Sequence, residues 1–179
     1  MKIVTKQTYQ LFWQHARRYQ PLFWLTVLGI SGGAVMGTIT PIYYKKFFDT
    51  LTGSATYDGL LKIILFILFL NAIQWLLWRV ATFANNYFQP RVMADLTNSS
   101  FEYLHNHSFG FFINRFVGGL VRKVGRLIRA FEDIADSFYW NLIPTTVRIT
   151  SILAVLFYFY PQLGWLILAW CVVYLVINY

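Results

Sequence analysis

The side chains that could carry chemistry are few and lie far apart along the chain. His15, His105 and His107 have no acidic or cysteine companions at a metal-ligand spacing, so we interpret them as surface histidines. The single cysteine, Cys171, lies in an apolar run. This excludes a disulfide framework and a paired-cysteine metal site, and it favours a buried, inert thiol.

The sequence also lacks the groups that would hold or hydrolyse a nucleotide. It contains no glycine-rich loop that ends in Gly-Lys-Ser or Gly-Lys-Thr, whose backbone amides would cradle a phosphate. Its apolar runs contain no paired acids, no nucleophile with a base and no metal-binding cluster, so a membrane enzyme is disfavoured. We therefore expect no catalytic residue, no metal site and no cofactor bound by this chain.

Arg148 is a basic residue whose position suggests a substrate contact. It lies twelve residues before Tyr160, about 18 Å along a helix, so its charge begins within an apolar layer. The guanidinium could line an inward-facing cavity and attract anionic head groups, or it could extend to the inner membrane interface. Trp75, Trp78 and Phe83 could form an aromatic wall for an amphipathic substrate, or they could anchor the chain in the interface.

Four phenylalanines lie close together in the middle of the chain. If Ser108 caps a short helix at about residues 107–116, Phe109, Phe112 and Phe116 share one face at spacings of i, i+3 and i+7. Such an apolar helix face is suited to dock in a groove of a partner domain, although the phenylalanines could instead fold the loop back onto its own helices. The residues that we expect to contact the partner are Ser108, Phe109, Phe111, Phe112, Asn114, Arg115 and Phe116.

The composition indicates that much of this chain is solvated by lipid. Of its 179 residues, 58% are hydrophobic and 12% are charged, about half the charged fraction of a typical soluble domain. After Arg148 no charged residue occurs up to Tyr179, and only Tyr160-Pro161-Gln162 interrupts the apolar run. We expect an all-α, polytopic membrane helical bundle. The net charge of +8 does not indicate nucleic acid binding, because the basic residues flank apolar runs and form no single stripe.

The apolar runs predict four membrane spans, at about residues 21–46, 60–80, 141–160 and 163–179. Residues 1–20 precede them as an interfacial elbow helix. The apolar side of that helix consists of Tyr9, Phe12, Trp13 and Ala16, and its other side consists of Lys6, Gln10, Gln14, Arg17 and Arg18. The alternative is an ordinary amphipathic helix that packs on protein.

The distribution of lysine and arginine predicts a cytoplasmic N-terminus in a multi-pass protein of the cell membrane. The first twenty residues contain four basic residues without an acid, and the long connection between spans two and three contains eight when Arg79 and Arg148, in the adjoining ends of those spans, are counted with it. Lys45 and Lys46 fall at the outer end of the first span, where Asp49 could pair with either.

The second and third spans are expected to continue far beyond the bilayer. A helix from Leu60 to about Asn106 would be about 70 Å long, and one from about Val117 to Tyr160 about 65 Å, whereas the hydrocarbon core is about 30 Å thick. Both would therefore project into the cytosol. Pro90 and Pro144 could kink these helices. In the first span, a packing face for a neighbouring helix is expected at Gly29, Gly33 and Gly37.

This arrangement resembles the N-terminal part of the transmembrane domain of type I ATP-binding-cassette (ABC) exporters. The stretch from Pro41 to Asp49 is similar to the one that closes the first helix of that family. Phe101 to Leu104, Phe111-Phe112 and the run Gly118 to Lys123 resemble its first cytosolic loop, which contains a short coupling helix. The chain departs from the family at Arg126-Leu127, where the family often has Asn-Asp.

The resemblance implies a domain, residues 21–179, that forms part of a substrate pathway and couples ATP hydrolysis to outward transport. It implies a nucleotide-binding domain that binds ATP and Mg, as a missing C-terminal part or a separate chain, and a second transporter half in a homodimer or heterodimer. It also implies that this chain is incomplete, because it stops in its fourth helix. Ile30 to Ala34 mimics a nucleotide-binding signature but lies inside an uncharged span, so we expect packing there. The alternative is a small, non-transporting four-span membrane protein whose phenylalanine-rich tip recruits a soluble partner.

Overall fold

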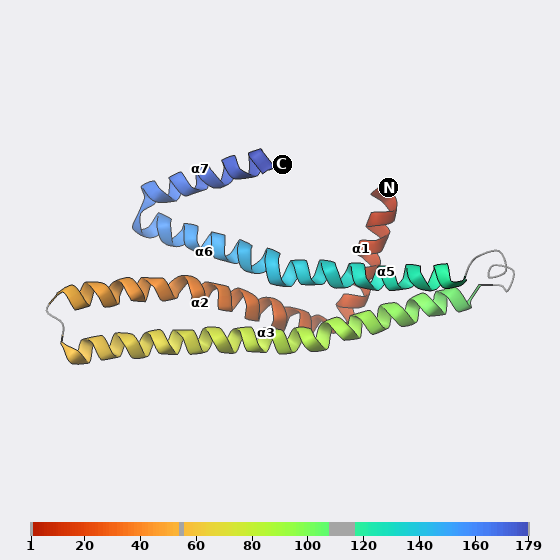
Figure 1. Ribbon diagram of the computed structural model, residues 1–179, viewed down its shortest axis with the longest axis horizontal. Coiled ribbons are helices and arrows are strands. Elements are labelled where there is room, and N and C mark those ends of the chain that lie inside the picture. The colour runs from red at the N-terminus through yellow and green to blue at the C-terminus, as the bar shows by residue number, and fades with distance from the viewer. Residues whose placement is uncertain (1, 54–55, 108–116, 179) are drawn as a thin grey trace. The chain divides into compact units, whose positions relative to one another are not determined.

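The structure, a computed structural model, describes residues 2–53, 56–107 and 117–178. Within these ranges every element is a helix, which confirms the all-α prediction (Figure 1). The elements are α1 (Lys2–Ala16), the short 3-10 helix η1 (Arg17–Tyr19), α2 (Gln20–Thr52), α3 (Tyr57–His105), α5 (Val117–Asp136), the π-helical segment η2 (Ser137–Leu142), α6 (Ile143–Phe159) and α7 (Pro161–Asn178).

Among the residues that the structure describes, three helical runs are long and apolar enough to cross a membrane, namely Gln7–Thr52, Tyr57–His105 and Gly118–Phe159. The apolar helix Pro161–Tyr174 is shorter. Large hydrophobic side chains remain exposed along these helices, among them Leu28, Leu68, Trp165 and Val176. Apolar surface on this scale is unfavourable in water and is expected where acyl chains are the solvent. The protein is therefore a multi-pass membrane protein.

Polar side chains inside the apolar helices bond to their own backbone. The hydroxyls of Thr26, Thr38 and Thr40 donate to the carbonyl oxygens four residues earlier, at 2.9, 3.2 and 2.9 Å. Asn71 donates from Nδ2 to the carbonyl of Ile67 at 2.8 Å. Because hydrocarbon offers no hydrogen-bond partner, these bonds allow polar residues to lie in a lipid-facing helix.

The prediction of one unbroken helix from Leu60 to about Asn106 is confirmed by α3, which has 49 residues and continues through Pro90. The prediction of a single helix to Tyr160 holds with one modification, because six residues of π-helix separate α5 from α6. This segment ends two residues before Pro144, which has no N–H to donate and whose ring crowds the carbonyl one turn earlier. A wider local turn accommodates both effects.

The chain forms two compact units, which we describe separately. The first contains Met1–Leu28 and Arg79–Asn141, and the second contains Gly29–Trp78 and Leu142–Tyr179. The core of the first unit is aromatic, and its buried side chains include Phe12, Phe88, Phe131 and Tyr139. The core of the second unit is formed by smaller residues, including Ile30, Ala34, Thr40 and Leu70.

Candidate functional site

In the second unit, a groove of about 380 Å³ between α2 and α6 contains Arg148. It is lined by Gly37, Thr38, Pro41, Ile42, Lys45, Arg148, Ile152, Val155, Leu156, Phe159 and Tyr160. Most of these side chains are apolar, two are cationic and none is acidic. Among the described residues, Arg148 forms no ion pair. A guanidinium on an apolar wall without a carboxylate suits the anionic group of an amphipathic molecule.

The second cation of this groove has a partner that the sequence did not indicate. Lys45 donates from Nζ to the Tyr160 hydroxyl at 3.0 Å, and its ammonium lies 5.6 Å from the centre of the same ring. The expected pairing with Asp49 is not observed. Tyr160 lies between α6 and α7, and its N–H donates to the carbonyl of Leu156 at 2.7 Å. This contact therefore joins the C-terminal part of α2 to the corner between α6 and α7.

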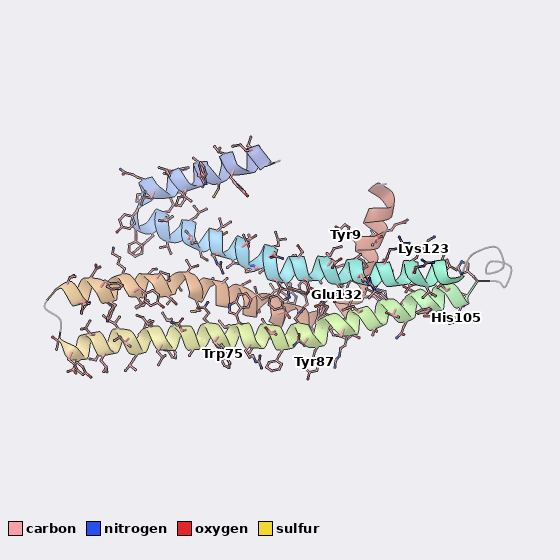
Figure 2. The ribbon with its side chains drawn as sticks, viewed as in Figure 1. Tyr9, Trp75, Tyr87, His105, Lys123 and Glu132 are labelled. Carbon is pink, nitrogen blue, oxygen red and sulfur yellow. The ribbon has the colours of Figure 1, made fainter. Side chains whose placement is uncertain are left out.

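The aromatic residues proposed for the cavity do not join Arg148 in this groove. Trp75, labelled in Figure 2, is 67% exposed. Trp78 packs against α2, where it covers Gly33. Phe83 belongs to the other unit, and its ring lies under the Arg79 guanidinium, 4.6 Å from ring centre to Cζ. Their role in a substrate pathway stays a prediction.

The predicted glycine face of α2 makes close contacts with α3. A Cβ atom at Gly33 would lie 2.7 Å from Trp78 Cδ1 and Nε1, and one at Gly37 would lie 3.0 Å from Gln74 Nε2. Gly32, which was not predicted, also lies near α3, because a Cβ there would be 3.1 Å from Leu77 Cδ1. Gly29 is buried. The absence of side chains at Gly33 and Gly37 is therefore what allows α3 to approach.

The predicted docking segment lies outside the described residues. Ser108, Phe109, Phe111, Phe112, Asn114, Arg115 and Phe116 all fall between the end of α3 and the start of α5. Their proposed contact with a partner stays a prediction.

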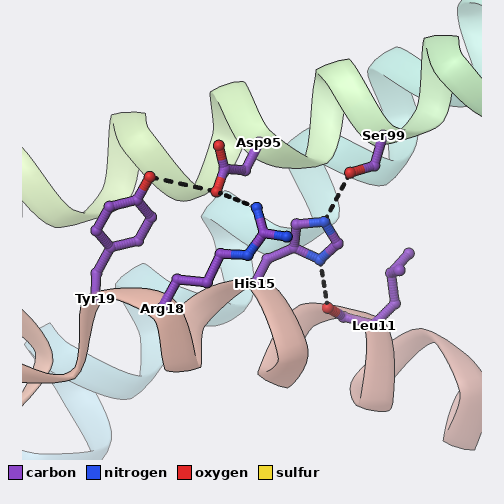
Figure 3. Close-up of polar contacts among 6 residues, drawn as sticks. All are labelled: Leu11, His15, Arg18, Tyr19, Asp95 and Ser99. Atoms are coloured by element: carbon purple, nitrogen blue, oxygen red, sulfur yellow. Dashed lines mark hydrogen bonds and ion pairs between the residues drawn. The ribbon is translucent and has the colours of Figure 1, made fainter.

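In the first unit, polar contacts hold α1 against α3 (Figure 3). His15 bonds through Nδ1 to the Leu11 carbonyl and through Nε2 to Ser99 Oγ, both at 2.9 Å. Asp95 accepts hydrogen bonds from Arg18 Nη1 and from the Tyr19 hydroxyl, both at 3.3 Å. The interpretation of His15 as a surface histidine was wrong, since its side chain is only 7% exposed. Because the carbonyl of Leu11 can only accept, Nδ1 carries the proton, and in the neutral ring Nε2 accepts from Ser99.

A sequence signal for this contact existed in the helical spacing. His15 lies three residues after Phe12 and one before Ala16, so it belongs to the edge of the buried face of α1. Asp95 and Ser99 lie one turn apart on α3, which allows both to face α1. The pairing itself joins residues 84 positions apart, and helical spacing does not predict it.

A polar chain inside the first unit was also missed. Asn85 donates from Nδ2 to Gln89 Oε1 at 2.9 Å, and Gln89 donates from Nε2 to Asp136 Oδ1 at 3.2 Å. Asn85 is buried, and its Oδ1 has no partner among the described residues. The bond from Gln89 connects α3 to the last residue of α5.

The long apolar helices agree with the comparison to known families. The family described as the ABC transporter transmembrane region matches residues 22–179. The chain belongs to this family. Its long helices and its groove with Arg148 are therefore parts of an ABC transporter transmembrane region.

A curated relative is the protein described as "Iron-sulfur clusters transporter atm1, mitochondrial" from Neurospora crassa. It is 23% identical over 144 residues, which cover 76% of this chain and 19% of the relative. The ABC transmembrane region described here therefore spans about a fifth of the length of that transporter.

Proposed function

We propose that this chain forms part of the substrate pathway of an ABC exporter and couples ATP hydrolysis in a nucleotide-binding domain to outward transport. The observation that carries the proposal is the match of residues 22–179 to the ABC transporter transmembrane region. The likeness to a transporter from Neurospora crassa supports it.

The length of α3 supports a role in coupling. Its 49 residues correspond to about 74 Å, more than twice the thickness of the hydrocarbon core of about 30 Å. In our proposal the N-terminal, apolar part of α3 spans the membrane and its polar remainder projects into the cytosol. A rigid helix of this length transmits a displacement at its cytosolic end to the membrane-spanning part.

The same proposal includes the elbow at residues 1–20, four spans and a cytoplasmic N-terminus. Exposed basic residues support this orientation, since Arg122, Lys123, Arg126 and Arg129 all lie on the surface of α5. A second transporter half completes the pathway, and ATP and Mg bind to the nucleotide-binding domain.

The groove with Arg148 is the part of the proposed pathway that the described residues support best. Its apolar wall and its two cations, Arg148 and Lys45, fit an amphipathic substrate with an anionic group.

The coupling proposal is tested in the complete transporter, reconstituted with its nucleotide-binding domain in vesicles. Phe112→Ser together with Phe116→Ser should leave membrane insertion intact but uncouple ATP turnover from transport. A matched control is Phe48→Ser, because Phe48 is an exposed phenylalanine near the C-terminal end of α2. ATP hydrolysis and substrate accumulation are measured in the same vesicles. An unchanged ratio of transport to ATP hydrolysis in the double variant would refute docking by this segment.

A further inference from the structure

A small apolar cavity lies in the first unit and is lined by residues of α1, the N-terminal part of α2, the interior of α3, the C-terminal part of α5 and η2. Its volume is about 240 Å³, below the range of about 300–1,000 Å³ that is typical of sites for drug-sized ligands. Its lining includes the aromatic residues Tyr9, Phe12, Trp13, Phe23, Phe138 and Tyr139. A cavity of this size and lining suits a single apolar chain better than a large substrate.

The walls of the cavity are built from aromatic rings in mutual contact. The ring of Phe12 meets that of Phe131 edge to face, with centres 5.4 Å apart. The ring centre of Phe23 lies 6.0 Å from that of Phe88 and 5.9 Å from that of Tyr139. Rings that pack in this way have little freedom to collapse into the space between them, so the cavity is preformed.

The π-helical segment contributes two neighbouring residues to the same cavity. Phe138 and Tyr139 are consecutive, and their rings lie 5.5 Å apart. Tyr139 is fully buried, whereas Phe138 is partly exposed at the edge. A π segment widens the helix by one residue per turn and often occurs at functional sites. Here it allows consecutive residues of one helix to line one cavity.

Helix α1 forms one side of the cavity, and polar contacts hold it against α3. His15 of α1 bonds to Ser99 of α3, and Arg18 of the adjoining η1 bonds to Asp95 of α3 (Figure 3). Tyr9 and Trp13, at the rim, are 54% and 55% exposed. Aromatic side chains that are half exposed beside an apolar opening are typical of the boundary between head groups and acyl chains.

A cation lies one turn from this rim. Arg17 follows Trp13 by four residues, is exposed, and forms no ion pair among the residues that the structure describes. Helix α2 begins three residues later, at Gln20. An apolar cavity, an aromatic rim and an unpaired arginine beside the start of a span match the parts of an anionic phospholipid.

We propose that this cavity binds one acyl chain of an anionic phospholipid of the cytoplasmic leaflet, and that Arg17 contacts its negatively charged head group. The inference rests on the proposed function only in placing α1 at the membrane interface. The lipid fills the space between α1 and η2 and thereby stabilises the position of α1 against α3 and α5.

The test uses the protein in phosphatidylcholine vesicles with a trace of phosphatidylglycerol that has a photoreactive diazirine on its acyl chain. After illumination, labelled peptides are identified by mass spectrometry. Label should concentrate on α1 and η2, and it should exceed the label obtained with phosphatidylcholine that has the same reactive chain. Arg17→Gln should abolish this preference for the anionic lipid, whereas Lys62→Gln, at an exposed position near the start of α3, should not.

A variant that fills the cavity provides a second test of the lipid site. Ile134 lines the cavity and is 41% exposed, so Ile134→Trp should fill it and lower the label on α1 and η2 at least about tenfold. The matched control is Ile149→Trp, at a position that is 45% exposed on α6 and outside this cavity, and its labelling should be that of the wild type. If Ile134→Trp does not accumulate, Tyr9→Glu at the exposed rim should give the same loss by repelling the phosphate.

The results separate this proposal from the proposed function. Label on α3 and α7 but not on α1 and η2, or label on α1 and η2 that neither variant lowers, would overturn the lipid site alone. Equal labelling by the two lipids would overturn the role of Arg17. A protein that no lipid probe labels would overturn the membrane placement itself.

Discussion

Gly33 of α2 lies against the indole ring of Trp78 on α3. A Cβ atom at position 33 would lie 2.7 Å from both Cδ1 and Nε1 of that ring, closer than van der Waals contact allows. The indole is large and rigid, so the two helices keep this spacing only while position 33 has no side chain.

We therefore expect Gly33→Ala to destabilise the protein by about 1–3 kcal/mol, because the added methyl group displaces Trp78 or separates the helices. The matched control is Gly125→Ala in α5, where a Cβ atom would meet nothing within 4 Å. That change should stabilise the protein by about 0.5–1 kcal/mol, since alanine loses less backbone entropy in a helix. Thermal unfolding in detergent measures both. A melting temperature for Gly33→Ala at or above that of the wild type would contradict the contact.

Ser99→Ala should loosen α1. It leaves Nε2 of the buried His15 without its hydrogen bond, which costs about 1–3 kcal/mol. The expected result is faster tryptic cleavage at Arg17 and Arg18, measured in the folded protein. Ser100→Ala is the matched control, because the Ser100 hydroxyl donates only to the Leu96 carbonyl of its own helix, at 2.6 Å. Equal cleavage rates in the two variants would show that His15 does not hold α1.

Arg148→Gln should weaken the response of the complete transporter to anionic amphiphiles. If the guanidinium of Arg148 contacts an anionic group in the groove, the loss of this contact weakens the binding free energy by about 1.5–3 kcal/mol. This corresponds to roughly a ten- to hundredfold lower apparent affinity. The measurement is ATP hydrolysis stimulated by anionic and zwitterionic amphiphiles of equal chain length. Arg148→Lys should recover part of the response to the anionic amphiphile.

The control for this experiment is Arg91→Gln, at an exposed arginine that lies over the ring of Tyr87 and outside the groove. It should behave as the wild type. If Arg148→Gln also behaves as the wild type with both amphiphiles, Arg148 only extends to the membrane interface.

The helices and their lipid-facing surfaces could be predicted because they depend on local properties. Uncharged runs and the positions of prolines predicted α2, α3 and the corner at Pro161 closely, since backbone hydrogen bonding in lipid must be satisfied within each helix. The spacing of Tyr9, Phe12, Trp13 and Ala16 predicted one apolar side of α1, and all four residues line the same cavity.

The errors concerned residues whose partners lie far away in the sequence. His15 is buried because Ser99, 84 residues later, supplies a hydrogen bond that makes burial of the imidazole acceptable. The role of Trp78 as a cavity wall or an anchor stays a prediction, but the packing of its ring against Gly33 was missed for the same reason. The π-helical turn before Pro144 was not predicted, because several local geometries can accommodate a proline in a helix.

By itself, the sequence determined that this chain forms long membrane helices, because hydropathy and helical periodicity are sums over neighbouring residues. The tertiary structure alone decided that α1 bonds to α3, that Gly33 lies against Trp78 and that η2 lines an aromatic cavity. These features depend on which helix faces meet, and the free energy of such contacts belongs to pairs of residues distant in the chain rather than to any local pattern.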